Sequence, residues 1–350
     1  MTDTAVAGTV RAMACDITVH VPGDGAPECA ADVVDPALRV FRAVHRACTR
    51  FEADSPLMRA NRAPDRWHDV PAVLFDAVRE AHGAYVRTRG RFDPRVLTDL
   101  VRLGYDRSLG FERGAVATGR ADDGRADRGT GGARGPWRPR FRGGPRPQLH
   151  LGGSPVDLGG IGKGLALRWA ADRLSATTTA PFLLDAGGDC VCRGPGPGGG
   201  GWQVGVEHPL DTAAARTGAP DRSDDPDGAD ATGDSAATDA GGPVAVLSLE
   251  DRAVATSSTR LRRWTAGGVA AHHLIDPRTG RPGGGGLAAV TVVADDPARA
   301  EVLTKALFLS GARSIGAEAR RRSVAALWVG VDGSVSTSGP MDRYVVWRAA

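Results

Sequence analysis

A glycine-rich run at residues 156–164 holds the side chains of this sequence that are best suited to chemistry. It reads Val-Asp-Leu-Gly-Gly-Ile-Gly-Lys-Gly, with Asp157 and Lys163 as its charged members, and an apolar helical pattern follows at once. Glycines allow backbone groups to approach a ligand closely, and the start of the following helix favours a phosphate or another anion. Asp157 adds an acceptor for a hydroxyl, an amide or a metal. The run therefore indicates a ligand site.

Two common phosphate-binding motifs do not describe this run. It is not a Walker A loop, because no Ser or Thr follows Lys163, and it does not match the G-x-G-x-x-G pattern. A tight strand-to-helix turn with an exposed lysine is the structural alternative.

Three further turns combine acidic residues with glycine or proline, at residues 91–94, 185–189 and 273–280. Each turn alone is more often structural than functional. Asp185 and Asp276 could serve only to cap their turns, and His273 could be a packed strand residue. Taken together with residues 156–164, the turns look like one cleft built from loops on a rigid scaffold.

Composition narrows the class of protein. The chain has 350 residues, which suits one large domain or two closely packed ones. Its 44 basic and 41 acidic residues give a net charge of +3, so charge provides no argument for a nucleic-acid or membrane partner. No stretch reaches the roughly 18 apolar residues that a membrane span needs, and we expect no membrane anchor.

Cysteine usage indicates a reducing compartment. An odd number of cysteines without a C-x-x-C pair predicts reduced thiols and a cytoplasmic protein. Residues 1–15 lack the apolar core of a signal peptide, although residues 12–15, Ala-Met-Ala-Cys, superficially resemble a lipoprotein cleavage site. The five cysteines are Cys15, Cys29, Cys48, Cys190 and Cys192.

Strands and helices are expected in an irregular order, which predicts an α+β fold rather than a doubly wound sheet. Alternating apolar residues predict strands, and apolar residues at helical spacing predict helices. The expected strands lie at 10–21, 182–192, 202–206, 244–249, 254–258, 287–294, 324–331 and 344–347, and the expected helices at 36–48, 71–87, 163–174 and 297–309.

Two tracts of biased composition interrupt this pattern. Residues 107–147 hold ten arginines and many glycines, with Phe111, Trp137 and Phe141 as candidate anchors. Residues 211–242 hold eight aspartates and almost no large apolar side chain, so we expect this acidic tract to be disordered. We interpret both as insertions into a single domain spanning residues 1–350.

In their order along the chain, the motifs resemble those of the FAD:protein FMN transferase (ApbE) family. The resemblance covers nearly all of the chain outside the two tracts. The matching segments are Met13-Ala14-Cys15 (a loose match), Phe51 to Asn61, Gly90 to Pro94, Asp157 to Gly164, Gly187 to Asp189, Trp202 to Pro209, Ala255 to Ser257 and His273 to Gly280.

The resemblance implies a fold and an activity. The fold would be a mixed-sheet, T-fold-like architecture with an FAD cleft between two lobes. The activity would be Mg²⁺-dependent transfer of the FMN half of FAD to a Thr or Ser hydroxyl of a target flavoprotein, with release of AMP. Two alternatives are an FAD pyrophosphatase, in which water is the acceptor, and a catalytically impaired protein that binds FAD.

The resemblance also implies roles for individual residues. Lys163 would act on the phosphates, and His273 would be the general base for the acceptor hydroxyl. Gly160 would fall where a backbone or side-chain oxygen of the family reaches the metal. The residues expected to contact FAD are Met13, Phe51, Arg91, Phe92, Asp93, Asp157, Lys163 and Leu274.

The sequence departs from the family pattern at the expected metal site. The family has Asp and Thr as metal ligands on a late helix, whereas this chain has Glu301 and Lys305 at those positions, with Thr304 one residue early. Glu301 and Lys305 are spaced to form an ordinary ion pair on one helix face, worth about 0.2–0.5 kcal/mol. A lysine beside a carboxylate ligand would compete with Mg²⁺, so we expect weakened metal binding.

Overall fold

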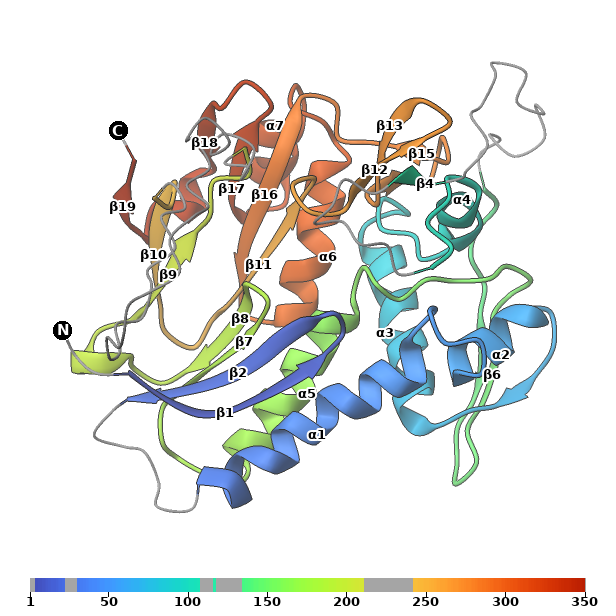
Figure 1. The fold of residues 1–350 in the computed structure, drawn as a ribbon, viewed down its shortest axis with the longest axis horizontal. Helices are drawn as coiled ribbons and strands as arrows, with labels where there is room; N and C mark the ends of the chain where they lie inside the picture. The colour runs from blue at the N-terminus through green and yellow to red at the C-terminus, as the bar shows by residue number, and fades with distance from the viewer. Residues whose placement is uncertain (1–3, 23–29, 108–115, 118–133, 211–241, 350) are drawn as a thin grey trace, which may run out of the picture.

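An eight-stranded antiparallel sheet forms the centre of the protein (Figure 1). The computed structural model describes residues 4–22, 30–107, 116–117, 134–210 and 242–349. In sheet order, the strands are β1 (Thr4–Ala12), β2 (Cys15–Pro22), β7 (Phe182–Ala186), β8 (Asp189–Arg193), β11 (Ala253–Ser258), β16 (Leu287–Ala294), β17 (Ala325–Gly330) and β18 (Val335–Thr337).

Two of the expected single strands are hairpins, which corrects the prediction. The strand expected at 10–21 is divided by a turn in which Met13 and Ala14 have positive φ angles of 55° and 63°. The strand expected at 182–192 is divided at Gly187 and Gly188, with φ angles of 64° and 88°. Tight hairpin turns use residues with positive φ, which glycine adopts readily. Met13 and Ala14 are not residue types that mark such a turn in a sequence.

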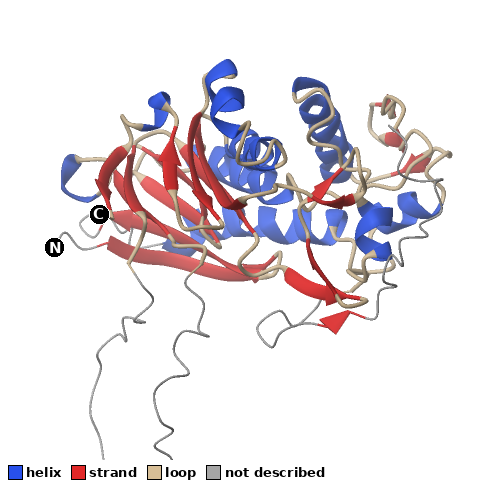
Figure 2. Cartoon of the chain, turned by 90° about the horizontal axis from the view of Figure 1, so that it is seen from above, coloured by secondary structure: helices blue, strands red, loops and turns tan. Residues whose placement is uncertain are grey.

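Helices cover one face of the sheet (Figure 2). Helices α1 (Ala30–Cys48) and α5 (Gly162–Ser175) pack on β1, β2, β7 and β8, while α6 (Pro297–Phe308) and α7 (Ile315–Arg321) pack on β11, β16 and β17. Helix α1 begins before its predicted start, and Pro36 lies inside it. Val34, which precedes that proline, is buried in the core with Ala37 and Leu38, so packing extends the helix past its apparent start signal.

A small sheet covers the opposite face of the large sheet. Its strand order is β19 (Val345–Arg348), β10 (Ala245–Leu249) and β9 (Trp202–Val206). Trp202 and Leu247 pack on Cys190 and Leu327 of the large sheet. Short 3₁₀ turns lie at Pro197–Gly199 and Gly339–Met341.

A second lobe lies beside the C-terminal end of α1. A separate core joins two of its helices to the starts of α5 and α6 and includes the buried Trp137, while Phe141 packs against it. Its helices are α2 (Pro56–Arg62), α3 (Ala72–Arg87) and α4 (Leu97–Arg102), and its strands are β3 (His68–Asp69), β4 (Val116–Ala117), β5 (Arg140–Arg142), β6 (Gln148–His150), β12 (Arg263–Ala266), β13 (Val269–His272), β14 (Ile275–Asp276) and β15 (Arg281–Pro282).

The α+β fold class predicted from the sequence is confirmed. Residues 134–147 of the arginine-rich tract belong to the fold, since β5 pairs with β6. Phe111 and all of the acidic tract except Gly242 lie outside the described residues. Among the described segments, no helix combines the length and the apolarity needed to cross a bilayer.

Candidate active site

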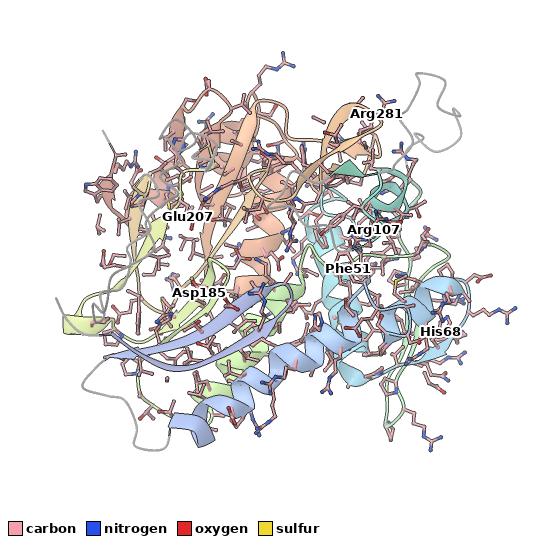
Figure 3. The ribbon with its side chains drawn as sticks, in the orientation of Figure 1. Phe51, His68, Arg107, Asp185, Glu207 and Arg281 are labelled. Atoms are coloured by element: carbon pink, nitrogen blue, oxygen red, sulfur yellow. The ribbon has the colours of Figure 1, made fainter. Side chains whose placement is uncertain are left out.

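A cavity of about 1870 Å³ lies between the sheet and the second lobe. It is lined by the turns that close the hairpins, by the loops that precede α5 and follow α1, and by one face of α6. Figure 3 shows Phe51 near the end of α1, with Asp185 and Glu207 on the sheet side. The predicted site residues that line the cavity are Met13, Phe51, Arg91, Phe92, Asp93, Asp157, Gly160, Lys163, His273, Leu274, Glu301 and Lys305.

An arginine and an aspartate form one wall of the cavity. Asp157 Oδ2 accepts the Nε of Arg50 at 3.0 Å, and its Oδ1 accepts the backbone N–H of Gly159 at 2.5 Å. The Arg50 guanidinium lies 4.3 Å and 4.2 Å from the ring centroids of Phe51 and Tyr105. Phe51 remains 45% exposed. This wall therefore presents an aromatic face beside a carboxylate.

Asp93 is already engaged within the protein. Its Oδ2 pairs with Arg95 Nη2 at 2.7 Å, and its Oδ1 accepts the backbone N–H of Arg95 at 2.9 Å. Phe92 packs against the glycine-rich turn, since a Cβ at Gly160 would lie 3.0 Å from its ring. Asp93 thus stabilises its own turn, while the Phe92 ring packs beside the glycine-rich turn.

The start of α5 is capped by a side chain from another helix. Glu301 Oε2, from α6, accepts the backbone N–H of Gly164 at 2.8 Å. Gly164 is required there, because a Cβ would lie 2.5 Å from the Cα of Ala298. A carboxylate is favourable at a helix N-terminus. The anion position expected at this helix start is therefore partly filled by Glu301.

Lys163 is not the exposed lysine of the structural alternative. Its ammonium forms an ion pair with Asp189, which is nearly fully buried. Burial disfavours the charged ammonium, but the charges of Asp189 and Glu301 outweigh this effect and raise the pKa of Lys163 above its ordinary value. Lys163 therefore stays positively charged at the cavity surface.

His273 lines the cavity beside Arg262. The backbone carbonyl of Arg262 lies 3.4 Å from His273 Nδ1 and accepts the backbone N–H of His273 at 3.3 Å. Burial, together with the positive charges of Arg262 and Lys305, lowers the pKa of His273 well below its ordinary value. The imidazole is therefore neutral at pH 7. By contrast, Asp276 forms a turn, accepting the backbone N–H of Arg278 at 2.9 Å.

Comparison with known proteins identifies the family of this chain. The model of the ApbE family matches residues 13–328, which span the turns that line the cavity. The chain belongs to the ApbE family. An FAD:protein FMN transferase of Treponema pallidum is 30% identical over 212 residues, covering 58% of this chain and 51% of that relative. The chain spans about half or less of the length of the first curated relatives it matches.

Solved structures of ApbE proteins share the fold. The ApbE protein of Thermotoga maritima superposes with a TM-score of 0.76 at 22% identity, covering 97% of this chain and 98% of that one. The flavinyl transferase ApbE of Pseudomonas stutzeri gives 0.75 at 19% identity, covering 100% and 98% of the two chains. The ApbE-like architecture implied by the motifs is therefore confirmed.

The residues of α6 do not fit the Mg²⁺ that the family resemblance implies. Both oxygens of Glu301 are engaged, one by Gly164 and the other by Lys305 Nζ at 3.3 Å. Thr304 is fully buried and, unlike the other predicted site residues, does not line the cavity. Its hydroxyl donates to the carbonyl of Glu301 at 2.7 Å and lies 2.6 Å from Ser257 Oγ.

A positive charge also stands at this position. The Lys305 ammonium lies 3.4 Å from Ser257 Oγ, and its stem packs 3.3 Å from where a Cβ at Gly160 would be. Mg²⁺ needs several oxygens in octahedral geometry. Among the described residues, no group of three His, Cys, Asp or Glu side chains is placed to hold a metal.

Sequence reasoning missed Arg50, Ser257 and Arg262 as individual site residues. Arg50 directly precedes the segment Phe51 to Asn61, and Ser257 ends the Ala-Thr-Ser motif. Both contact residues that are distant in the sequence, Asp157 and Thr304, and these contacts exist only in the folded protein. Arg262 follows the Ala-Thr-Ser motif in an arginine-rich segment, Arg260 to Arg263, where composition alone does not distinguish one arginine from the next.

Proposed function

We propose that this protein is an FAD:protein FMN transferase with FAD bound in the cavity. The observation that carries the proposal is the convergence of the motif turns on one cavity, although they are scattered from Met13 to Leu274 along the chain. The names of the relatives support the same activity. Phe51, Arg91, Phe92, Asp157, Lys163 and Leu274 are the proposed FAD contacts, with Met13 and Asp93 supporting them.

The flavin ring suits the wall formed by Phe51 and Asp157. An exposed aromatic ring stacks well on a planar ligand. The carboxylate of Asp157 can accept the ring N–H of the flavin, and Arg50 holds that carboxylate in place. The phosphates then belong on the side of Lys163 and Lys305.

The proposed reaction is a phosphoryl transfer. The oxygen of an acceptor Thr or Ser forms a bond to the flavin-side phosphorus, and the bond from that phosphorus to the bridging oxygen of the diphosphate breaks. AMP leaves with the bridging oxygen. His273 takes the proton of the attacking hydroxyl, and its neutral state at pH 7 suits that role. Its Nδ1 can donate to the Arg262 carbonyl, leaving Nε2 as the acceptor.

An FAD pyrophosphatase would use the same cavity with water as the acceptor. A protein that binds FAD without turning it over is favoured by a separate observation, the ion pair between Glu301 and Lys305 where metal ligands were expected.

The described cysteines are free thiols, which supports a cytoplasmic location. They are Cys15, Cys48, Cys190 and Cys192.

One experiment separates these activities. The purified protein is incubated with FAD, with and without a threonine-containing acceptor domain, and both AMP and protein-bound flavin fluorescence are followed. Flavin on the acceptor in step with AMP supports the transferase. AMP with free FMN and no protein-bound flavin indicates the pyrophosphatase, and FAD binding without AMP indicates the impaired protein.

A further inference from the structure

Arg262 brings an uncompensated positive charge into the cavity. It lies in the bend between β11 and β12, where its side chain is half-buried and lines the cavity. Within the described ranges, its guanidinium makes no hydrogen bond or ion pair with another residue. Its N–H donors are therefore available to an anion that enters the cavity.

Three other cations of the cavity, unlike Arg262, have carboxylate partners. Lys163 pairs with Asp189, Lys305 with Glu301, and Arg260 with Glu207. The charge of Arg262 acts on Lys163 and on His273, opposing the protonation of both. It therefore stands within electrostatic reach of the proposed phosphate position and of the proposed base.

We infer that Arg262 binds the diphosphate of the ligand and that the cavity neutralises this group with protein cations instead of a divalent metal. A guanidinium presents a planar fork of donors that matches two phosphate oxygens. The Lys305 ammonium, held between Glu301 and Ser257, supplies the second fixed cation. That the diphosphate is part of FAD rests on the proposed function.

Binding measurements in EDTA test the inference with three probes: FAD, riboflavin and inorganic pyrophosphate. Arg262→Gln is expected to weaken pyrophosphate and FAD about tenfold, the value of one charge-assisted hydrogen bond at a half-buried site. Riboflavin, which has no phosphate, is expected to bind equally to both proteins. Arg262→Lys should retain part of the affinity. The matched control is Arg320→Gln, on the exposed face of α7 away from the cavity.

The outcomes distinguish this inference from the proposed function. Pyrophosphate binding in EDTA that Arg262→Gln weakens supports the inference. Pyrophosphate binding that requires Mg²⁺, or that Arg262→Gln leaves unchanged, overturns the inference. If the wild type nevertheless binds FAD, the proposed function still stands. If pyrophosphate binds as expected but neither FAD nor riboflavin binds, the proposed function fails while the anion site remains. Since Arg262 has no side-chain partner to lose, the variant is expected to melt like wild type.

Discussion

At the scale of residues, we expect Asp157 to serve both folding and binding. Its carboxylate is the charged partner of the buried Arg50, so Asp157→Ala would leave that guanidinium without a counter-charge and destabilise the protein by about 3 kcal/mol. Asp157→Asn keeps the shape and one acceptor. We expect it to reduce FAD affinity roughly tenfold, by removing the charged acceptor of the flavin N–H. Titration of flavin fluorescence measures this. Unchanged affinity would remove Asp157 from the flavin site, and Asp65→Ala, at an exposed turn, is the control.

The pH dependence of turnover should report the environment of His273. A base acts in its neutral form, so activity is lost as pH falls through its pKa. Because burial and the charges of Arg262 and Lys305 lower that pKa, AMP release should stay constant from pH 8 down past the ordinary histidine value near 6.5. It should decline only in more acidic buffer, and His273→Gln should abolish the acid limb together with most activity. An acid limb centred at or above pH 6.5 would contradict this assignment.

We predict that Lys305 weakens the dependence of turnover on a metal. Lys305→Thr removes the ammonium that engages Glu301 Oε1 and places a hydroxyl on the cavity face of α6. We expect FAD turnover by this variant to become dependent on Mg²⁺, whereas the wild type shows weak dependence. The rate of AMP release is measured across a Mg²⁺ titration, with Arg299→Gln, an exposed residue of α6, as the control. If both proteins show the same strict Mg²⁺ dependence, Lys305 has no part in phosphate neutralisation.

At the scale of elements, the sequence predicts the periodic segments well and their junctions poorly. Helix α3 and strand β16 follow their apolar patterns closely. The turn at Met13 and the early start of α1 do not follow from the sequence pattern. The residues at the turn are not typical turn residues, and the residues before Pro36 carry no helix-start signal, so tertiary packing determines both features. The capping of α5 by Glu301 is likewise invisible in the sequence, since 137 residues separate Glu301 from Gly164.

The contact between α5 and α6 offers a test at this scale. Gly164→Ala would force a Cβ against the backbone of Ala298 and Pro297, both at 2.5 Å. Backbone atoms cannot move aside as a side chain can, so we expect a loss of about 1–3 kcal/mol in the free energy of unfolding. Chemical denaturation measures it. Gly143→Ala, with open space around its position, should change stability by less than about 0.5 kcal/mol. Equal stabilities for the two variants would contradict the close packing.

At the scale of the whole molecule, the order of the motifs predicted one cleft, but the sheet that builds it could not be predicted. Strand β8 meets β11 across only two paired positions, Ala253 with Val191 and Val254 with Cys190. Beyond them Asp189 turns to accept the backbone N–H of Thr256 at 2.9 Å and pairs with Lys163. Such long-range pairing depends on the assembled core, so the sequence named Lys163 without revealing its partner.

The acidic tract should be dispensable for this assembly. Strands β9 and β10, which flank it, pair directly through Val206 and Ala245, and Val244 N–H donates to the Val206 carbonyl at 2.8 Å. A short Gly-Ser loop in place of residues 211–241 can therefore join the two strands. We expect the variant to melt within a few degrees of wild type and to retain FAD affinity. An aggregated product, or a large drop in melting temperature, would show that the tract contributes to the fold.

The transfer reaction itself tests whether this cavity moves FMN from FAD to a protein hydroxyl. The protein is mixed with FAD and a threonine-containing acceptor domain in EDTA and then in Mg²⁺, and AMP is quantified beside the mass of the acceptor. We expect one AMP for each FMN gained by the acceptor, with measurable reaction already in EDTA. No FMN on the acceptor under either condition, despite bound FAD and an acceptor that a known flavin transferase modifies, would contradict it.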